Sequence, residues 1–180
     1  MAQLASDKGN LIESEKWMKK ALALDQTSAQ MHEFYAVLLG QMKRPSEAIV
    51  QLKKAEELEP INPRYPYLLA LTYAEMGKTD RTESLLLRVT KLDAKHDRAW
   101  YNLGLLYAAK NKLDEAINAI KQAETCNKNE PSYPYARATI HLRKGEQKEA
   151  FEACRTCLGI DRNYKPALNL LRQFRQPSNR

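Results

Sequence analysis

The chain has 180 residues, of which 43% are hydrophobic and 28% are charged, and its formal net charge is +7. This is the composition of an ordinary globular protein, which argues against intrinsic disorder. No apolar run approaches the ~20 residues that cross a bilayer, and the segment from Met1 to Asp7 lacks the basic and apolar stretches of a secretory signal. We therefore expect a soluble chain without a membrane segment, of unspecified compartment.

The positive charge is concentrated at one end of the sequence. Residues 131–180 hold 10 Lys and Arg against 4 Asp and Glu, whereas residues 1–130 hold 19 against 18. A basic end can suit an acidic partner or nucleic acid. A solvated helix face is the more common explanation of such charge, and no nucleic-acid-binding motif accompanies it. We therefore do not expect a nucleic-acid partner.

Segments of the chain match one another at a spacing of 34 residues. Residues 100–107 align with residues 66–73 and 134–141, and apolar columns such as Leu24, Leu58, Leu92 and Ile160 repeat in the second half of each unit. In chain order, this period predicts a partial repeat with a complete second helix at 1–28, full repeats at 29–62, 63–96, 97–130 and 131–164, and a capping helix with a frayed tail at 165–180.

Each full unit is predicted to contain two helices separated by a turn. In unit 97–130, the first helix carries Trp100, Leu103, Gly104 and Tyr107 on one face, and the turn at 110–112 interrupts the pattern. Neither helix can bury its apolar stripe alone, so helices must pair and pairs must stack. Small residues share one first-helix column, which allows close helix packing: Ala36, Ala70, Gly104 and Ala138.

The turns carry the expected punctuation. Gly77 and Gly145 follow the first helices of their units, where a left-handed residue is needed, and Pro45, Pro63 and Pro131 stand at helix starts. Thr82 replaces the small alanine of its column, so the second helix of unit 63–96 is expected to be slightly irregular.

The pattern Trp100-x2-Leu103-Gly104-x2-Tyr107, followed by Ala116-x3-Ile120-x2-Ala123, resembles the tetratricopeptide repeat family. The resemblance extends over essentially the whole chain. It implies an all-α, right-handed superhelical solenoid in which the first helices line a concave groove. It also implies a protein-interaction scaffold or adaptor rather than an enzyme.

The residues expected in that groove lie on the first helices, opposite the Leu69 and Leu103 column. They form a tyrosine ladder beside an apolar floor, with arginine and other polar residues at the edges. The set comprises Arg64, Tyr67, Leu71, Arg98, Tyr101, Asn102, Leu105, Tyr135, Thr139 and Arg143. Tyrosine and arginine often dominate interface energies, so we expect a partner protein or peptide here.

Two alternatives to a peptide groove stay open. The tyrosines can instead pack between neighbouring first helices and support the stacking. The whole chain can also serve as an oligomerisation or spacer module of a larger protein, with no peptide ligand. The incomplete first helix of residues 1–28 leaves an edge through which copies could self-associate.

Some members of the family clamp a chaperone's C-terminal carboxylate with Lys, Asn and Arg on three successive first helices. The matching positions hold few of these residue types: Glu33, Val37, Tyr67, Leu68, Leu71, Arg98, Asn102, Ser132 and Ala136. We therefore expect no carboxylate clamp.

The remaining reactive residues point to packing. Cys154 and Cys157 fall in core columns, lack the further ligands of a zinc site, and are expected to be buried thiols. His141 falls in the Tyr107 column and is expected to pack at the edge of the core, and Cys126 is expected to be a partly exposed lone thiol. No catalytic residue, metal site or cofactor is predicted.

Overall fold

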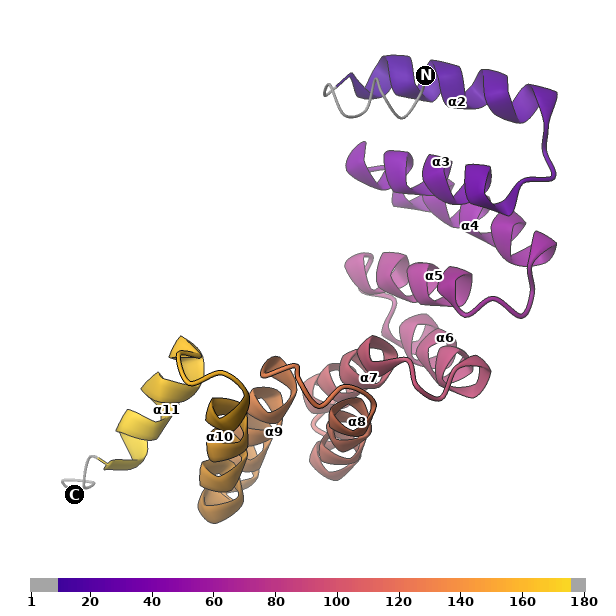
Figure 1. Ribbon diagram of the computed structural model, residues 1–180. Helices are drawn as coiled ribbons and strands as arrows, with labels where there is room; N and C mark the ends of the chain where they lie inside the picture. Colours follow the sequence, from indigo (N-terminus) through magenta and orange to yellow (C-terminus); the bar gives the residue numbers. More distant parts are fainter. Residues whose placement is uncertain (1–9, 176–180) are drawn as a thin grey trace. The chain divides into compact units, whose positions relative to one another are not determined.

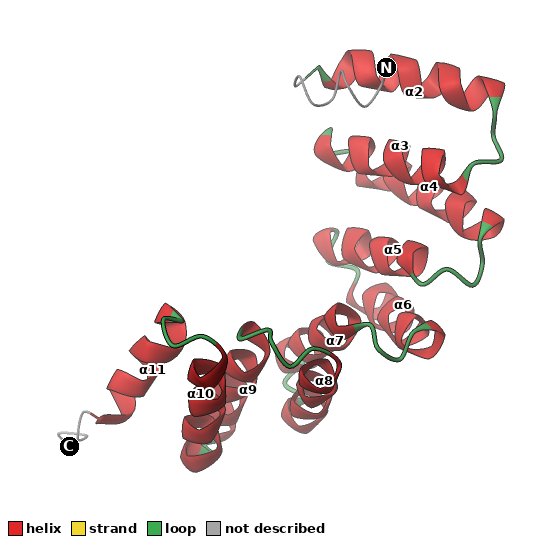
Figure 2. Ribbon diagram, viewed as in Figure 1, coloured by secondary structure: helices red, strands yellow, loops and turns green. Residues whose placement is uncertain are grey.

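The computed structural model describes residues 10–175, and within this range the chain is helical, with no strand (Figure 1, Figure 2). The helices, in chain order, are α2 (Leu11–Leu24), α3 (Ala29–Gln41), α4 (Pro45–Leu58), α5 (Arg64–Glu75), α6 (Thr79–Leu92), α7 (Asp97–Ala109), α8 (Leu113–Cys126), α9 (Ser132–Lys144), α10 (Gln147–Ile160) and α11 (Lys165–Arg175). Among the described residues, no helix has both the length and the apolar character needed to span a membrane.

The helices belong to two compact units, which we call unit 1 (α2–α6) and unit 2 (α7–α11). In unit 1, α3 packs against α4 and α5 against α6, while α4–α5 and α2–α3 contacts join successive pairs. In unit 2, α7 packs against α8 and α9 against α10, with α8–α9 and α10–α11 contacts between them. Packing between helices that are neighbours in sequence is typical of a solenoid, and the predicted all-α repeat architecture is confirmed.

The turn inside each helix pair has the same backbone conformation. A residue with positive φ follows the first helix of every pair, and these four residues stand 34 positions apart: Lys43 (59°), Gly77 (69°), Asn111 (60°) and Gly145 (84°). Glycine adopts this conformation without steric cost, and asparagine tolerates it. The expectation for Gly77 and Gly145 is confirmed, and Lys43 is the least favourable residue of the column.

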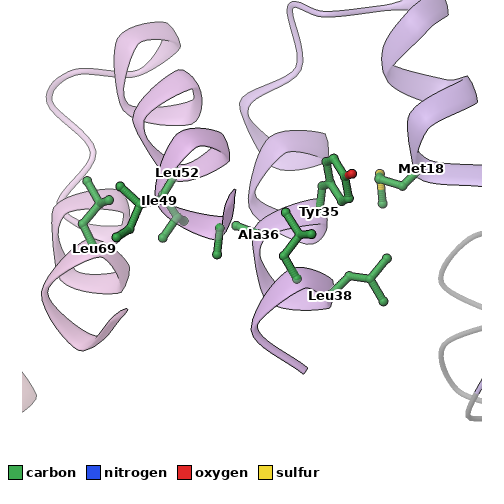
Figure 3. Close-up of a cluster of buried hydrophobic side chains, with 9 residues drawn as sticks. Met18, Tyr35, Ala36, Leu38, Ile49, Leu52 and Leu69 are labelled. Atoms are coloured by element: carbon green, nitrogen blue, oxygen red, sulfur yellow. The ribbon is translucent and has the colours of Figure 1, made fainter. Parts of the chain in front are cut away.

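The core of unit 1 joins three successive helix layers. Tyr35 on α3 faces Met18 of α2, and Leu69 of α5 lies beside Ile49 and Leu52 of α4 (Figure 3). These side chains are buried, so each first helix is covered by a second helix on either side. This burial is the main source of stability for the stack.

The second helix of the 63–96 unit, α6, is continuous over its 14 residues. Thr82 is buried in it, and its hydroxyl donates a hydrogen bond to the Lys78 carbonyl oxygen at 3.1 Å. A threonine can therefore replace the small alanine of this column because its polar atom is satisfied within the helix.

Gly104 of α7 lies in close contact with α8 in unit 2. A Cβ atom at this position would lie 2.5 Å from Cδ1 and 2.7 Å from Cγ1 of Ile120 on α8. Both distances are shorter than carbon atoms tolerate. Gly104 thus allows the contact that the small-residue column predicted.

The C-terminal helix covers the last repeat of unit 2. Leu170, Leu171 and Phe174 of α11 pack against a cluster that includes Ala153 and Cys154 of α10. The Cys154 and Cys157 side chains are fully buried, and burial raises the pKa of both thiols. Their predicted role as core residues is confirmed.

Candidate partner-binding surface

The tyrosines predicted to line a groove in unit 2 pack between successive first helices. The rings of Tyr101 on α7 and Tyr133 on α9 lie 4.9 Å apart between centroids, and Tyr135 on α9 lies 5.5 Å from Tyr164, which directly precedes α11. Both Tyr101 and Tyr135 are half-buried. This geometry matches the packing alternative and leaves part of each ring accessible to a partner.

Hydrogen bonds fix the position of this stack. The Tyr133 hydroxyl and the Asn127 amide each donate to Oδ2 of Asp97 at 2.9 Å. Burial works to raise the pKa of Asp97, but the hydrogen bonds from Asn127 and Tyr133 outweigh it and hold that pKa below its usual value. The ionised carboxylate therefore ties the start of α7 to the start of α9.

Arg64, predicted at the mouth of a groove, is engaged within the chain. Its Nε donates to both carboxylate oxygens of Glu33 at 2.8 Å, and its Nη2 donates to Oε1 at 2.6 Å. Glu33 lies on α3 and Arg64 on α5, so the pair bridges the two first helices. Glu33 is buried, and its hydrogen bonds to Arg64 raise the pKa of the guanidinium. Because a buried carboxylate needs its partner, Arg64 is held by Glu33 and cannot freely serve a ligand.

The other predicted residues are distributed over unit 2. Leu105, Arg98 and Arg143 are exposed, whereas Asn102 and Thr139 are half-buried. The Thr139 hydroxyl donates to the Ala136 carbonyl oxygen at 2.7 Å within its own helix.

A groove of about 600 Å³ lies in unit 1 between the first helices α3 and α5, with α4 as its floor. Its walls and floor are mainly apolar, and they are formed by Ala36, Val37, Gly40, Lys43, Pro45, Ala48, Leu52, Leu68, Leu71, Thr72 and Glu75. Of the residues predicted from sequence, Leu71 lines this groove, and Tyr67 lies on the same helix, half-buried. Pockets of roughly 300–1,000 Å³ are typical of ligand-binding sites, so the volume suits a few side chains of a partner.

Gly40 leaves the groove open on the α3 side. A Cβ atom built on it meets no atom within 4 Å, and the neighbouring Val37 is 47% exposed. The corresponding residues of the other repeats are Ala74, Ala108 and Leu142, which all carry a side chain. A missing side chain at this position therefore enlarges the groove of unit 1.

The two ends of the groove each carry one acidic and one basic residue, but they differ in whether the two are paired with each other. Glu33 lies one turn before Val37 on α3, and Arg64 lies one turn before Leu68 on α5. The Glu33–Arg64 pair therefore stands at the end of the groove where the two first helices begin. Lys43 and Glu75 line the groove at the other end, where the first helices finish. Both are exposed, and neither forms an ion pair with a residue between 10 and 174.

Sequence reasoning missed most of this groove, although a signal was present. Val37 stands in the same column as Leu71 and Leu105, and Gly40 is a glycine inside a helix, which is uncommon without a reason. Lys43 lies in a turn and Glu75 at a helix end, and the expected groove residues were drawn from the faces of the first helices.

The remaining candidate groups have structural partners. His141 is buried, and its Nδ1 lies 2.6 Å from Oε2 of Glu146, which confirms a packed position at the edge of the core. Cys126 is partly exposed, as expected, and its thiol donates to the Ala94 carbonyl oxygen at 3.5 Å. Within residues 10–175, no cluster of three or more His, Cys, Asp or Glu could hold a metal ion.

Comparisons with solved structures give the same fold. The chain is similar to MamA, with a TM-score of 0.82 and 20% identity over 92% of this chain and 96% of that one. It is also similar to YrrB, described as a TPR protein with an unusual peptide-binding site, with a TM-score of 0.76 and 20% identity over 95% of this chain and 88% of that one. A third similar structure is PilF of Pseudomonas aeruginosa, with a TM-score of 0.78 and 21% identity over 96% of this chain and 81% of that one.

Sequence comparisons agree with the structural ones. No curated protein matches the sequence. Two family profiles, both of the tetratricopeptide repeat, match residues 67–134 and residues 1–28 and 135–164. Together with the helix pairs and the conserved turn geometry within the chain, these matches show that the protein belongs to the tetratricopeptide repeat family.

Proposed function

We propose that this chain is a protein-interaction module that binds a short peptide segment of a partner in the groove between α3 and α5. The tetratricopeptide repeat fold is that of a protein-interaction module, which supports the general class. The particular site rests on one observation, namely an open groove of about 600 Å³ with apolar walls in unit 1.

The physical basis of binding is the burial of apolar surface. Val37, Leu68 and Leu71 present apolar side chains from two first helices that face one groove. Covering this surface removes it from water, which contributes roughly 25 cal/mol for each Å² that becomes buried. A rigid, preformed groove adds little ordering cost, so a short segment can bind with useful affinity. YrrB, which has the same fold, is described as having a peptide-binding site, and this supports the same use here.

The test uses two glycines in matching structural contexts. Gly40 is the penultimate residue of α3 and Gly159 is the penultimate residue of α10. A Cβ atom built on either glycine meets no atom within 4 Å. Only Gly40 lines the groove. Gly40→Leu and Gly159→Leu should therefore both fold, since leucine favours a helix more than glycine does.

The experiment selects random short peptides displayed on phage against the wild-type chain and then measures binding of the recovered peptides. We expect Gly40→Leu to weaken their binding by roughly tenfold or more, equivalent to about 1.4 kcal/mol, and Gly159→Leu to leave it unchanged. Equal binding by both variants, or failure to recover any peptide, would contradict the proposal.

A further inference from the structure

We infer that the groove of unit 1 selects a segment with one bulky apolar anchor residue, flanked by an acidic residue on the Lys43 side and a basic residue on the Glu75 side. This inference rests on the proposed function, because it concerns the chemistry of the peptide in the same groove. It follows from the shape of the groove at Gly40 and from the placement of charge at its ends.

The bulky anchor residue of the peptide would occupy the space that is open beside Gly40, which has no side chain. Val37 and Leu71 are the corresponding residues of adjacent repeats, and both line the groove together with Leu68. The space beside them is open at Gly40, where no atom lies within 4 Å of an added Cβ. An aromatic or large aliphatic side chain can enter there and contact both helices, whereas a small one would leave the space unfilled.

The end of the groove near Arg64 offers little to a charged ligand. The Arg64 guanidinium and the Glu33 carboxylate satisfy each other with three hydrogen bonds of 2.6–2.8 Å. Glu33 is buried, so separating the pair would leave its carboxylate charge buried without a partner, which is unfavourable. A ligand therefore gains no net attraction by competing for either group.

The opposite end can recognise charge. Lys43, in the turn between α3 and α4, and Glu75, at the end of α5, both line the groove and have no ion-pair partner between residues 10 and 174. They belong to the two walls of the groove and differ in sign. A segment with an acidic and a basic residue beside the anchor would complement both, and complementarity of this kind sets register and direction more than affinity.

The test repeats the peptide selection with the charges exchanged. Peptides recovered on the wild-type chain should share an aromatic or large aliphatic residue, with acidic and basic residues at constant distances from it. On the Lys43→Glu/Glu75→Lys variant, the acidic and basic positions should exchange. On Gly40→Ala, the anchors should become smaller. Lys53→Glu, at an exposed residue of α4 that does not line the groove, should recover the same peptides as the wild type.

Synthetic peptides then give a quantitative answer. Reversing the charge of the acidic peptide residue should weaken binding to the wild type by about threefold to tenfold at low salt, and the loss should be restored on Lys43→Glu. If peptides bind the wild-type chain and lose binding to Gly40→Leu but show no charge preference, the inferred charge selectivity is wrong while the proposed function stands. If no recovered peptide responds to Gly40→Leu, the proposed function itself fails.

Discussion

At the scale of single residues, the tyrosine column shows how one side chain can serve packing and recognition. Tyr101 stacks on Tyr133, and burial raises the pKa of the Tyr101 hydroxyl, with Ser132 acting in the opposite direction. The ring therefore joins α7 to α9 while its outer part stays exposed. A loss of binding on removal of such a residue would not by itself prove contact with a ligand.

The contribution of Tyr101 to the stability of the fold can be measured. Tyr101→Ala should lower the free energy of unfolding by about 2–3 kcal/mol, because it removes a half-buried ring and the stacking contact of that ring with Tyr133. Tyr101→Phe should cost only about 0.5–1 kcal/mol, since the ring stays and only the hydroxyl group is removed. Urea unfolding measures both. Leu105→Ala, on the same helix but 42% exposed, is the control, and a Tyr101→Ala loss no greater than that of the control would refute the packing role.

Residue identity predicts local conformation better than it predicts partners. The left-handed turns at Gly77 and Gly145 could be predicted because few residues other than glycine favour that backbone conformation. The Arg64–Glu33 pair could not, because residues 31 positions apart meet only once the helices are packed. The sequence around an arginine at a groove edge looks the same whether its side chain binds a ligand or a neighbouring helix.

At the scale of helices, the match between Gly104 and Ile120 determines how closely α7 and α8 approach. The same two columns hold alanine in each of the other three pairs, namely Ala36 with Leu52, Ala70 with Leu86 and Ala138 with Cys154. Isoleucine branches at Cβ and brings atoms within 2.7 Å of an added methyl group, so the glycine and the isoleucine are expected to be interdependent.

This interdependence gives a double-mutant prediction. Gly104→Ala should destabilise the chain by about 1 kcal/mol, because a steric cost of about 1–3 kcal/mol exceeds the gain of up to about 1 kcal/mol in helix propensity. Adding Ile120→Leu should recover most of the loss, since leucine is the residue opposite alanine in two of the other three pairs. Thermal or urea unfolding of the two single variants and the double variant tests this, and strictly additive effects would exclude direct coupling.

A charged network attaches α2 to the following pair. The Glu15 carboxylate lies 2.8 Å from Nζ of Lys19, and it accepts hydrogen bonds from Arg44 at 2.9 Å and from the Tyr35 hydroxyl at 3.1 Å. The hydrogen bond with Lys19, with further ones from Arg44 and Tyr35, outweighs burial and lowers the pKa of Glu15 from 4.5 to about 2.

The lowered pKa predicts how the stability of unit 1 depends on pH. The stabilisation from the ionised carboxylate is fully present above pH 4.5 and is lost as the pH falls toward about 2. Glu15→Gln should therefore cost about 1 kcal/mol at neutral pH, after allowance for solvent screening, and very little near pH 2. Unfolding at several pH values measures the difference. Glu57→Gln, at an exposed residue of α4, is the control, and a Glu15→Gln effect that does not change with pH would contradict the assignment.

At the scale of the whole chain, the sequence was sufficient for the fold and insufficient for the site. A 34-residue period, carried by columns such as Leu24, Leu58 and Leu92, leads directly to stacked helix pairs because each helix needs a neighbour to cover its apolar face. The limits of the individual repeats remain predictions, and so does self-association through the edge at residues 1–28, of which residues 1–9 lie outside the described residues.

The groove depends on how several side chains jointly fill or leave space. Gly40, Val37 and Leu68 belong to different columns, and no single column indicates a cavity. The expected ladder of tyrosines followed one column and therefore found Tyr67, Tyr101 and Tyr135, of which the latter two stack against neighbouring tyrosines. Predicting a groove requires the packing of three helices, which periodicity alone does not supply.

Methyl NMR of the full chain can establish whether a partner segment occupies the groove between α3 and α5. A selected peptide is titrated into chain labelled at its valine and leucine methyl groups. Binding in the groove should shift the methyl resonances of Val37, Leu68 and Leu71, which line it. It should leave unchanged those of Val50 and Leu87, which are exposed on the second helices α4 and α6. Shifts at Val50 and Leu87, with the groove methyls unmoved, would contradict it.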